Sequence, residues 1–138
     1  MTEKIDPFVV KFNANGLRQW GTYYGGAAPD YGRSCTVDNG GNVYLAGYTS
    51  STTAIAFGGH QNMSGGGYDA FLLQFNSSGF LQWGTYCGGT AWDIGTSCAV
   101  DATGNVFLAG HTSTTTAMAS GGYQNTYTEG SYDAFLVR

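Results

Sequence analysis

One block of sequence occurs twice in this chain, and a third copy begins before the chain ends. Phe8-Val-Val-Lys-Phe-Asn13 returns as Phe71-Leu-Leu-Gln-Phe-Asn76, and Gln19-Trp-Gly-Thr-Tyr23 returns as Gln82-Trp-Gly-Thr-Tyr86. Aligned without a gap at an offset of 63 residues, 8–62 and 71–125 share 34 identities in 55 pairs. Such a period indicates an array of one supersecondary unit, in which neighbouring units bury each other's apolar faces.

The repeat sets the expected organisation of the chain. We expect a single segment over 1–138, with a first repeat at about 6–68, a second at about 69–132, and the start of a third at 133–138. A unit of this size can hold only a marginal core by itself, because a small domain buries too little of its surface.

Composition favours many short strands and excludes some partners. Charged residues make up 10% of the chain, aromatic residues 15%, and there are 23 glycines. Five Lys and Arg, scattered through a chain of net charge −4, cannot line a phosphate backbone, so we expect no nucleic-acid partner. No apolar run is long enough for a membrane span, and residues 1–6 lack the apolar core of a signal peptide. The protein is then cytoplasmic, or its export signal lies outside this segment.

Each repeat divides into four apolar stretches separated by turn residues. In the first repeat these stretches are 8–12, 17–24, 34–37 and 43–49. Asn13-Ala-Asn-Gly16 and Asp38-Asn-Gly-Gly-Asn42 predict tight turns, because Asn and Asp bond to nearby backbone N–H groups and Gly accepts positive φ. The Ser/Thr/Gly-rich stretch 50–65 is expected to be a surface loop.

Both faces of the strand at 43–49 are apolar or aromatic, with Val43 and Leu45 on one face and Tyr44 and Tyr48 on the other. A sheet that is covered on both sides is typical of a propeller blade, which has a neighbouring blade against each face. We therefore predict an all-β chain of four-stranded antiparallel β-propeller blades, about two blades per chain. A solenoid is the alternative.

Three motifs recur in order: Asp-Ala-Phe-x-x-x-Phe-Asn-x-x-Gly, Gln-Trp-Gly-Thr-Tyr-x-Gly-Gly, and Val-Asp-x-x-Gly-Asn-Val-Tyr/Phe-Leu-Ala-Gly-x-Thr-Ser. In these motifs the chain resembles the bacterial beta-propeller repeat family (SBBP) from Asp6 to Arg138. The resemblance implies four-stranded blades and a secreted or cell-surface location. It implies no single activity, because the repeats of that family are scaffolding found beside many other domains.

Two blades are too few to close a propeller. The opening strand is present three times and the other strands twice, so both ends of the chain carry half-blades with unmet edges, which attract partners. We predict that identical chains close a ring, three giving six blades and four giving eight, or that the rest of a longer protein completes it.

The acidic residues and cysteines favour structural roles. All seven Asp occur at repeated positions, where a recurring turn explains them, although a calcium site in each blade is an alternative. Cys35 and Cys98 are equivalent and are expected to be small buried hydrophobes rather than redox or metal groups. No nucleophile–His–acid set is marked by the sequence, so we expect no enzyme, no catalytic residue, no metal and no cofactor.

Residues that differ between the repeats are the better candidates for function. The loops after Tyr24 and Thr49 should lie on one rim, which would carry exposed Trp92 in particular. Neutral divergence of the two copies is the alternative explanation. The candidate ligand-binding residues are Asp30, Tyr31, Tyr48, His60, Trp92, Asp93, His111 and Tyr123.

Two functions fit these features. The first is a non-catalytic structural or interaction module that assembles and displays rim loops to a protein or glycan ligand. The second is a carbohydrate-binding propeller, with Trp92 and nearby Tyr rings stacking on sugars. The repeated Trp20/Trp83 and Tyr23/Tyr86 are expected to pack between blades rather than form a sugar-stacking surface.

Overall fold

The computed structural model describes residues 4–116 and 118–138, which contain nine strands and no helix. The chain is all-β, as predicted. The strands are β1 (Phe8–Phe12), β2 (Arg18–Tyr23), β3 (Asp30–Val37), β4 (Val43–Thr49), β5 (Asp69–Phe75), β6 (Leu81–Cys87), β7 (Asp93–Val100), β8 (Val106–Thr112) and β9 (Asp133–Val137). The described part therefore has no helix that could cross a membrane.

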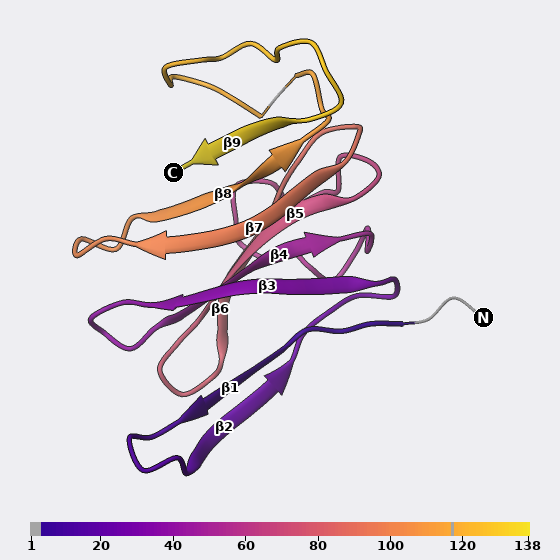
Figure 1. Cartoon of the computed structure of the whole chain (residues 1–138). Helices are drawn as coiled ribbons and strands as arrows, with labels where there is room; N and C mark the ends of the chain where they lie inside the picture. The colour runs from indigo at the N-terminus through magenta and orange to yellow at the C-terminus, as the bar shows by residue number, and fades with distance from the viewer. Residues whose placement is uncertain (1–3, 117) are drawn as a thin grey trace.

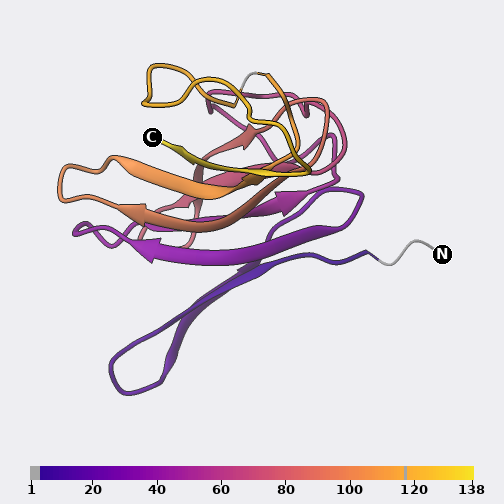
Figure 2. The same ribbon diagram turned by 45° about the horizontal axis from the view of Figure 1, so that its top comes forward.

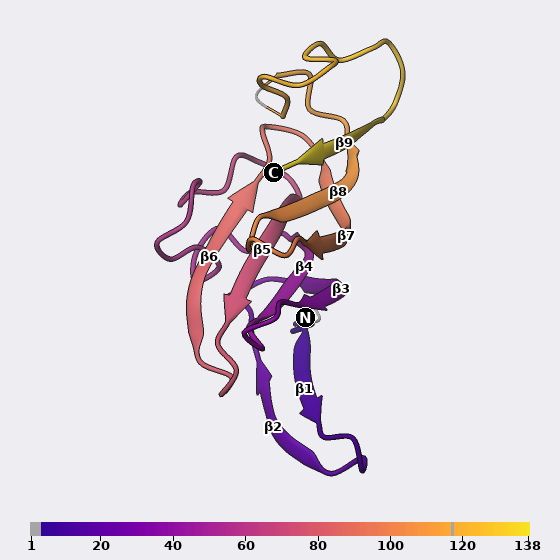
Figure 3. The same cartoon turned by 90° about the vertical axis from the view of Figure 1, so that its left-hand side faces the viewer.

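The strands form three antiparallel sheets stacked one upon another (Figure 1, Figure 2). The N-terminal sheet is β1-β2, the central sheet is β3-β4-β5-β6, and the C-terminal sheet is β7-β8-β9 (Figure 3). These are propeller-like blades of two, four and three strands, and the ring is not closed. The complete central blade takes its first two strands from the first repeat and its last two from the second, so blade and sequence repeat are out of phase.

The predicted turns form by the expected mechanism. Asn13 Oδ1 accepts from the backbone N–H of Asn15 (3.0 Å) and Leu17 (2.9 Å), and Gly16 follows at φ +77°. In the second turn type, Asp38 Oδ1 accepts from the backbone N–H of Gly40 and Asn42. The Asn42 side chain donates to Asp38 Oδ2 at 2.8 Å, and this bond, with the backbone donors, holds the pKa of Asp38 below its ordinary value.

Two apolar clusters lie between the sheets. The first packs Val9 of β1 against Phe71 and Phe75 of β5. The second packs Leu72 of β5 against the C-terminal sheet. The central sheet is thus covered on both faces, which confirms the interpretation of its apolar pattern. We call the side of a sheet toward earlier strands its preceding face, and the other side its following face.

The long loop from 50 to 68 differs from the expected free surface loop, because it packs along the outer strand β6. Phe57 and Gly84 exchange two backbone hydrogen bonds of 2.9 Å, and Tyr86 N donates to Gln61 O at 3.0 Å. Ile55, from the same loop, is buried in the first apolar cluster. The Ser/Thr/Gly composition gave no sign of this role, because it depends on one buried Ile and on backbone groups.

The two equivalent cysteines have different surroundings. Cys98 is buried as expected, and its Sγ lies 3.7 Å from the Ser34 carbonyl oxygen of the central sheet. Cys35 is exposed, contrary to the expectation, because the β1-β2 hairpin does not cover this part of the preceding face of β3. No disulfide joins the described cysteines.

Candidate functional site

A buried carboxylate fixes the rim of the central blade. Asp30 is fully buried, and its Oδ2 accepts from Gly26 N (2.7 Å) and Ser51 Oγ (3.1 Å). Thr49 Oγ1 donates to the other oxygen of the same carboxylate. Since Gly26 follows β2, while Thr49 ends β4 and Ser51 follows it, this network holds the two loops together, as a common rim requires.

The second repeat builds the same network around Asp93. Gly89 N donates to Asp93 Oδ2 at 2.8 Å and Thr114 Oγ1 donates to it at 2.9 Å, while Thr112 Oγ1 donates to Oδ1. Asp93 is also fully buried. The two aspartates therefore position the rim from beneath, and their oxygens are occupied by donors of their own chain.

Another buried carboxylate, that of Asp69, faces Asp93. Asp69 Oδ2 accepts from Ser64 Oγ (2.6 Å) and Gly65 N (2.8 Å), but Asp69 Oδ1 has no hydrogen-bond partner among the described residues. Burial, with a further contribution from the charge of Asp93, raises the pKa of Asp69. A Cβ at Gly88 would lie 2.8 Å from Asp93 Oδ2 and overlap Asp69 Oδ1, so only glycine fits between the two carboxylates.

The first repeat repeats this arrangement, with Gly25 between Asp6 and Asp30. Asp6 Oδ1 likewise lacks a hydrogen-bond partner in the described chain. No cluster of three or more His, Cys, Asp or Glu suited to a metal ion occurs among residues 4–116 and 118–138. The hydrogen bonds that Asp30, Asp69 and Asp93 accept from loop residues show that these three acids organise the loops.

Above this network, a pocket of about 470 Å³ opens on the rim between the central and C-terminal blades. Tyr31 and Tyr48 stack with ring centroids 4.7 Å apart. The Arg33 guanidinium lies 5.1 Å from the centre of the Tyr48 ring, and its Nη2 donates to Tyr48 Oη at 2.8 Å. The lining residues are Tyr31, Arg33, Tyr48, Tyr68, Trp92, Ile94, His111 and Tyr132.

Edge-to-face contacts extend the aromatic lining across both blades. Tyr68 meets Tyr48 at 5.4 Å and Trp92 at 5.5 Å, and His111 meets Tyr132 at 5.2 Å. Trp92 is nevertheless 51% exposed, which leaves part of the indole available to a ligand. Arg33 is the cation of this lining, and no carboxylate belongs to it.

The two repeats differ where they line this pocket. β3 and β7 share Asp, Gly, Ser, Cys and Val at equivalent positions. Tyr31 of β3 is aligned with Ile94 of β7, and Arg33 with Thr96. In β4 and β8 the lining position is Tyr48 in one copy and His111 in the other. The pocket is therefore specific to this pair of blades, unlike the aspartate network beneath it.

Four of the eight residues expected at the rim line the pocket: Tyr31, Tyr48, Trp92 and His111. Asp30 and Asp93 lie beneath it, whereas His60 and Tyr123 are exposed on the long loops and are not part of the lining. The sequence reasoning missed Arg33, Tyr68 and Tyr132. Arg33 could have been found from its difference with Thr96, but Tyr68 and Tyr132 are alike and carried no such signal.

A second type of candidate site lies at the two ends, where the sheets expose faces that the central blade buries. Tyr23 is 78% exposed, while its equivalent Tyr86 is 1% exposed. On the same preceding face, Phe12 is 58% and Phe75 is 2% exposed. At the other end, on the following face, Leu136 is 70% exposed and Leu72 is 7%.

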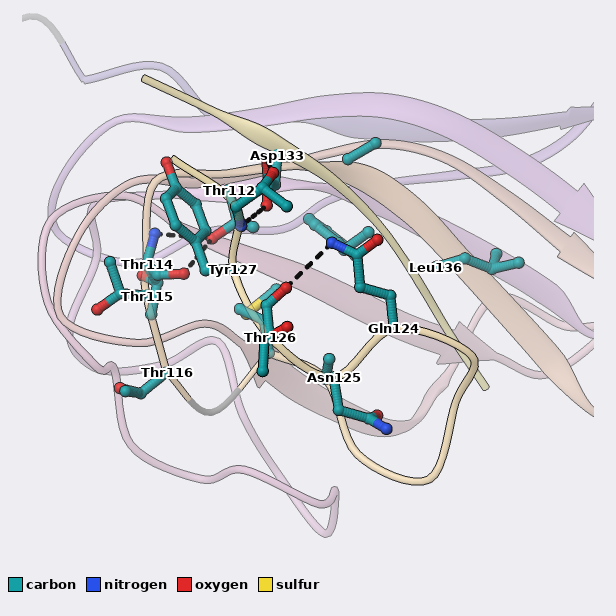
Figure 4. A pocket seen from close by; sticks show the side chains of 15 residues that line it. Thr112, Thr114, Thr115, Thr116, Gln124, Asn125, Thr126, Tyr127, Asp133 and Leu136 are labelled. Carbon is teal, nitrogen blue, oxygen red and sulfur yellow. Dashed lines mark hydrogen bonds between the residues drawn. The ribbon is translucent and has the colours of Figure 1, made fainter. Parts of the chain in front are cut away.

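The C-terminal end also has a groove of about 370 Å³ between β9 and the loop that precedes it (Figure 4). The groove is lined by Met118, Gln124, Thr128, Asp133, Phe135 and Leu136, among others. In the central blade, the outer strand β6 occupies the corresponding place between β5 and the loop 50–68.

Stacked four-stranded antiparallel sheets, each covered on both faces, define the class of β-propeller blades. Within that class, residues 19–52 match the model of the family described as Beta-propeller repeat (SBBP). The match covers β2 to β4 and confirms, for this segment, the resemblance found in the sequence. No curated protein matches the chain.

Proposed function

We propose that this chain is a non-catalytic interaction module, a propeller segment that assembles with copies of itself and displays the aromatic pocket on the rim. The observation that carries the proposal is the paired exposure of equivalent residues. Tyr86 and Phe75 show what covers this apolar face in a complete blade, namely the neighbouring repeat. Tyr23 and Phe12 present the same chemistry to solvent, and so a second copy supplies the matching cover.

Both ends of the chain are incomplete in complementary ways. The N-terminal sheet has the two outer strands of a blade, and the C-terminal sheet begins with the two inner strands. Contacts between unlike ends are heterologous, and they close into a ring when the rotation per chain permits. Three chains give six blades and four give eight, both within the usual range of propellers.

Light scattering on the purified chain tests the assembly. We expect a particle of three or four chains, each of 14.5 kDa. Phe12→Ser should shift the population toward monomer because Phe12 lies on the exposed preceding face. Phe80→Ser is the matched control, since Phe80 and its equivalent Leu17 are both exposed and no neighbouring blade covers either. A well-folded monomer at all concentrations would refute self-assembly.

Carbohydrate binding at the rim pocket is the second candidate function. The partly exposed Trp92 indole beside Tyr68 supports it, because aromatic faces pack on the C–H surfaces of sugar rings. Arg33 adds a positive charge that would favour sugars with a carboxylate.

Glycan titration followed by saturation-transfer NMR tests this candidate. Trp92→Ala should abolish binding. Arg33→Thr, which introduces the residue found at this position in the second repeat, should weaken the binding of acidic sugars more than that of neutral sugars. Tyr123→Ala is the control, because Tyr123 is exposed outside the pocket. No signal from any glycan, or full binding by Trp92→Ala, would argue against a sugar site.

A further inference from the structure

The central blade shows how an outer strand is held in its place. Phe57 and Gly84 exchange backbone hydrogen bonds, and Gln61 O accepts from Tyr86 N. The Gln61 side chain bonds the residue just after this strand, since its Nε2 donates to Gly88 O (3.1 Å) and its Oε1 accepts from Gly88 N (3.2 Å). Tyr86 Oη donates to Ser51 O at 2.9 Å, so the ring is anchored at its far end too.

The C-terminal groove carries the equivalents of these groups. Gln124 stands at the position of Gln61 and Met118 at that of Ile55, 63 residues later in each case. Gln124 is exposed, and its Nε2 donates to Thr126 O within its own loop (Figure 4). The groove thus offers the amide and the apolar floor with which the central blade holds a Gln-Trp-Gly-Thr-Tyr strand.

The chain has a second strand of this sequence at its other end. β2 carries Gln19-Trp-Gly-Thr-Tyr23, identical to the core of β6, and its Tyr23 is exposed. β2 is the outer strand of a hairpin, paired with β1 from Phe8↔Tyr23 to Phe12↔Arg18. Because the hairpin is one unit, β2 can fill the groove only together with β1.

The place that β1 would need is the one that β9 holds. In the central blade, β5 pairs with β4 through Gly47↔Phe71. β9 pairs with β8 in the same way, through Gly110↔Phe135. β1 begins with the equivalent Phe8, so its register on β8 would coincide with that of β9 and the two strands exclude each other.

From these contacts, and resting on the proposed assembly, we propose that β1-β2 of a second copy adds to the edge of β8 in place of β9, and that its β2 fills the C-terminal groove. β9 then serves as a cover strand that protects the β8 edge until the hairpin of another copy displaces it.

The exchange gives Thr128 a new partner of the same chemistry. Thr128 now donates its N–H (2.6 Å) and its hydroxyl (2.6 Å) to Asp133, and Asp6 of the incoming hairpin presents the equivalent carboxylate. Asp6 Oδ2 is at present paired with exposed Lys4 at 3.2 Å. Among the described residues no strand pairs with the outer side of β9, and the hairpin brings one, β2, to the groove.

The opposite end of the chain has a matching recess. A groove of about 540 Å³ lies between β1 and β3 and includes Cys35 and Leu45 in its lining. At the equivalent position in the C-terminal blade, Cys98 is covered by Ser34 and Tyr44 of β3 and β4. β7-β8 of the second copy therefore fits over Cys35 when its β8 accepts the hairpin.

Paired cysteine variants test which strand lies on β8. In the central blade Ala46 pairs with Leu72, so Ala109 should pair with Val9 of another copy after exchange, whereas it pairs with Leu136 in the single chain. Under mild oxidation, Val9→Cys with Ala109→Cys should give covalently linked chains on a non-reducing gel. Ala109→Cys with Leu136→Cys should form an internal disulfide that blocks assembly. Peptide mapping distinguishes these bonds from any that involve the native cysteines.

Removing the cover strand gives an independent readout. A chain ending at Ser131 should assemble with an apparent dissociation constant lower by about tenfold or more, because no internal strand competes for β8. If the wild type assembles but the Val9/Ala109 pair forms no link between chains, the exchange is wrong while the proposed function stands. Loss of assembly in the shortened chain, or normal assembly of the internally locked variant, overturns it likewise. A wild-type chain that is always monomeric refutes both.

Discussion

The same tyrosine stands in two environments, which allows folding and assembly to be separated by two substitutions. Tyr86 is buried in the first apolar cluster and its hydroxyl bonds to Ser51 O. Tyr23, at the equivalent position of the first repeat, is 78% exposed. Tyr86→Ala should therefore destabilise the folded chain itself, whereas Tyr23→Ala should leave the isolated chain nearly unchanged.

The magnitudes follow from these surroundings. Replacing a buried aromatic residue by Ala costs about 3–5 kcal/mol, and the unsatisfied Ser51 carbonyl adds about 1 kcal/mol. If the loop after β8 of a second copy buries Tyr23 as the loop 50–68 buries Tyr86, Tyr23→Ala should cost each contact between chains about 3 kcal/mol. That loss corresponds to an increase of about 100-fold in the dissociation constant.

Urea unfolding followed by circular dichroism measures the first effect, and light scattering over a dilution series measures the second. Unfolding should be recorded at low protein concentration, where assembly adds least to apparent stability. Two outcomes would refute the reasoning. One is an equal loss of unfolding free energy in the two variants, and the other is an unchanged dissociation constant for Tyr23→Ala.

Four further predictions concern the buried network and the thiols. Because the pKa of Asp69 is raised in the folded chain, this residue adds stability below the ordinary carboxyl pKa, and that stability is lost as the pH rises through the folded pKa. Asp69→Asn should therefore be more stable than the wild type near neutral pH. Thermal melts of both proteins at about pH 4 and 8 measure this, and no gain in melting temperature at pH 8 would contradict it. Asp93→Asn should instead lose about 1–3 kcal/mol, because its carboxylate accepts from Gly89, Thr112 and Thr114 and an amide nitrogen cannot; equal stability in urea would contradict this role. Gly88→Ala should destabilise the fold more than Gly104→Ala, whose Cβ meets nothing within 4 Å at φ +88°, and the reverse order would exclude the close approach of Asp69 and Asp93. Exposed Cys35 should react with a thiol reagent faster than Cys87, whose pKa burial raises to about 11. Assembly should slow the reaction of Cys35 selectively, so an equal rate for Cys35 before and after dilution of the assembled protein would contradict the coverage of Cys35 by a second copy.

The candidate sites were only partly accessible from the sequence. Positions that differ between the repeats identified Tyr31, Tyr48, Trp92 and His111, because divergence against a repeated background marks residues free of the common packing. Tyr68 and Tyr132 escaped that criterion since both copies carry Tyr before the repeated Asp. Their place in the pocket arises because residues just before β5 and β9 emerge beside the ends of β3 and β4, or β7 and β8, a relation that is long-range.

The sequence by itself determined the local structure of this protein. Asn and Asp followed by Gly form its turns, alternating apolar residues form its strands, and apolar residues on both strand faces require stacked sheets, all through interactions that act within a few residues or a single sheet. The tertiary structure decided how the strands are divided among blades, and hence the fate of identical residues. Tyr86 and Cys98 are buried while Tyr23 and Cys35 are exposed because burial depends on which neighbouring sheet lies opposite, and no local pattern specifies that neighbour.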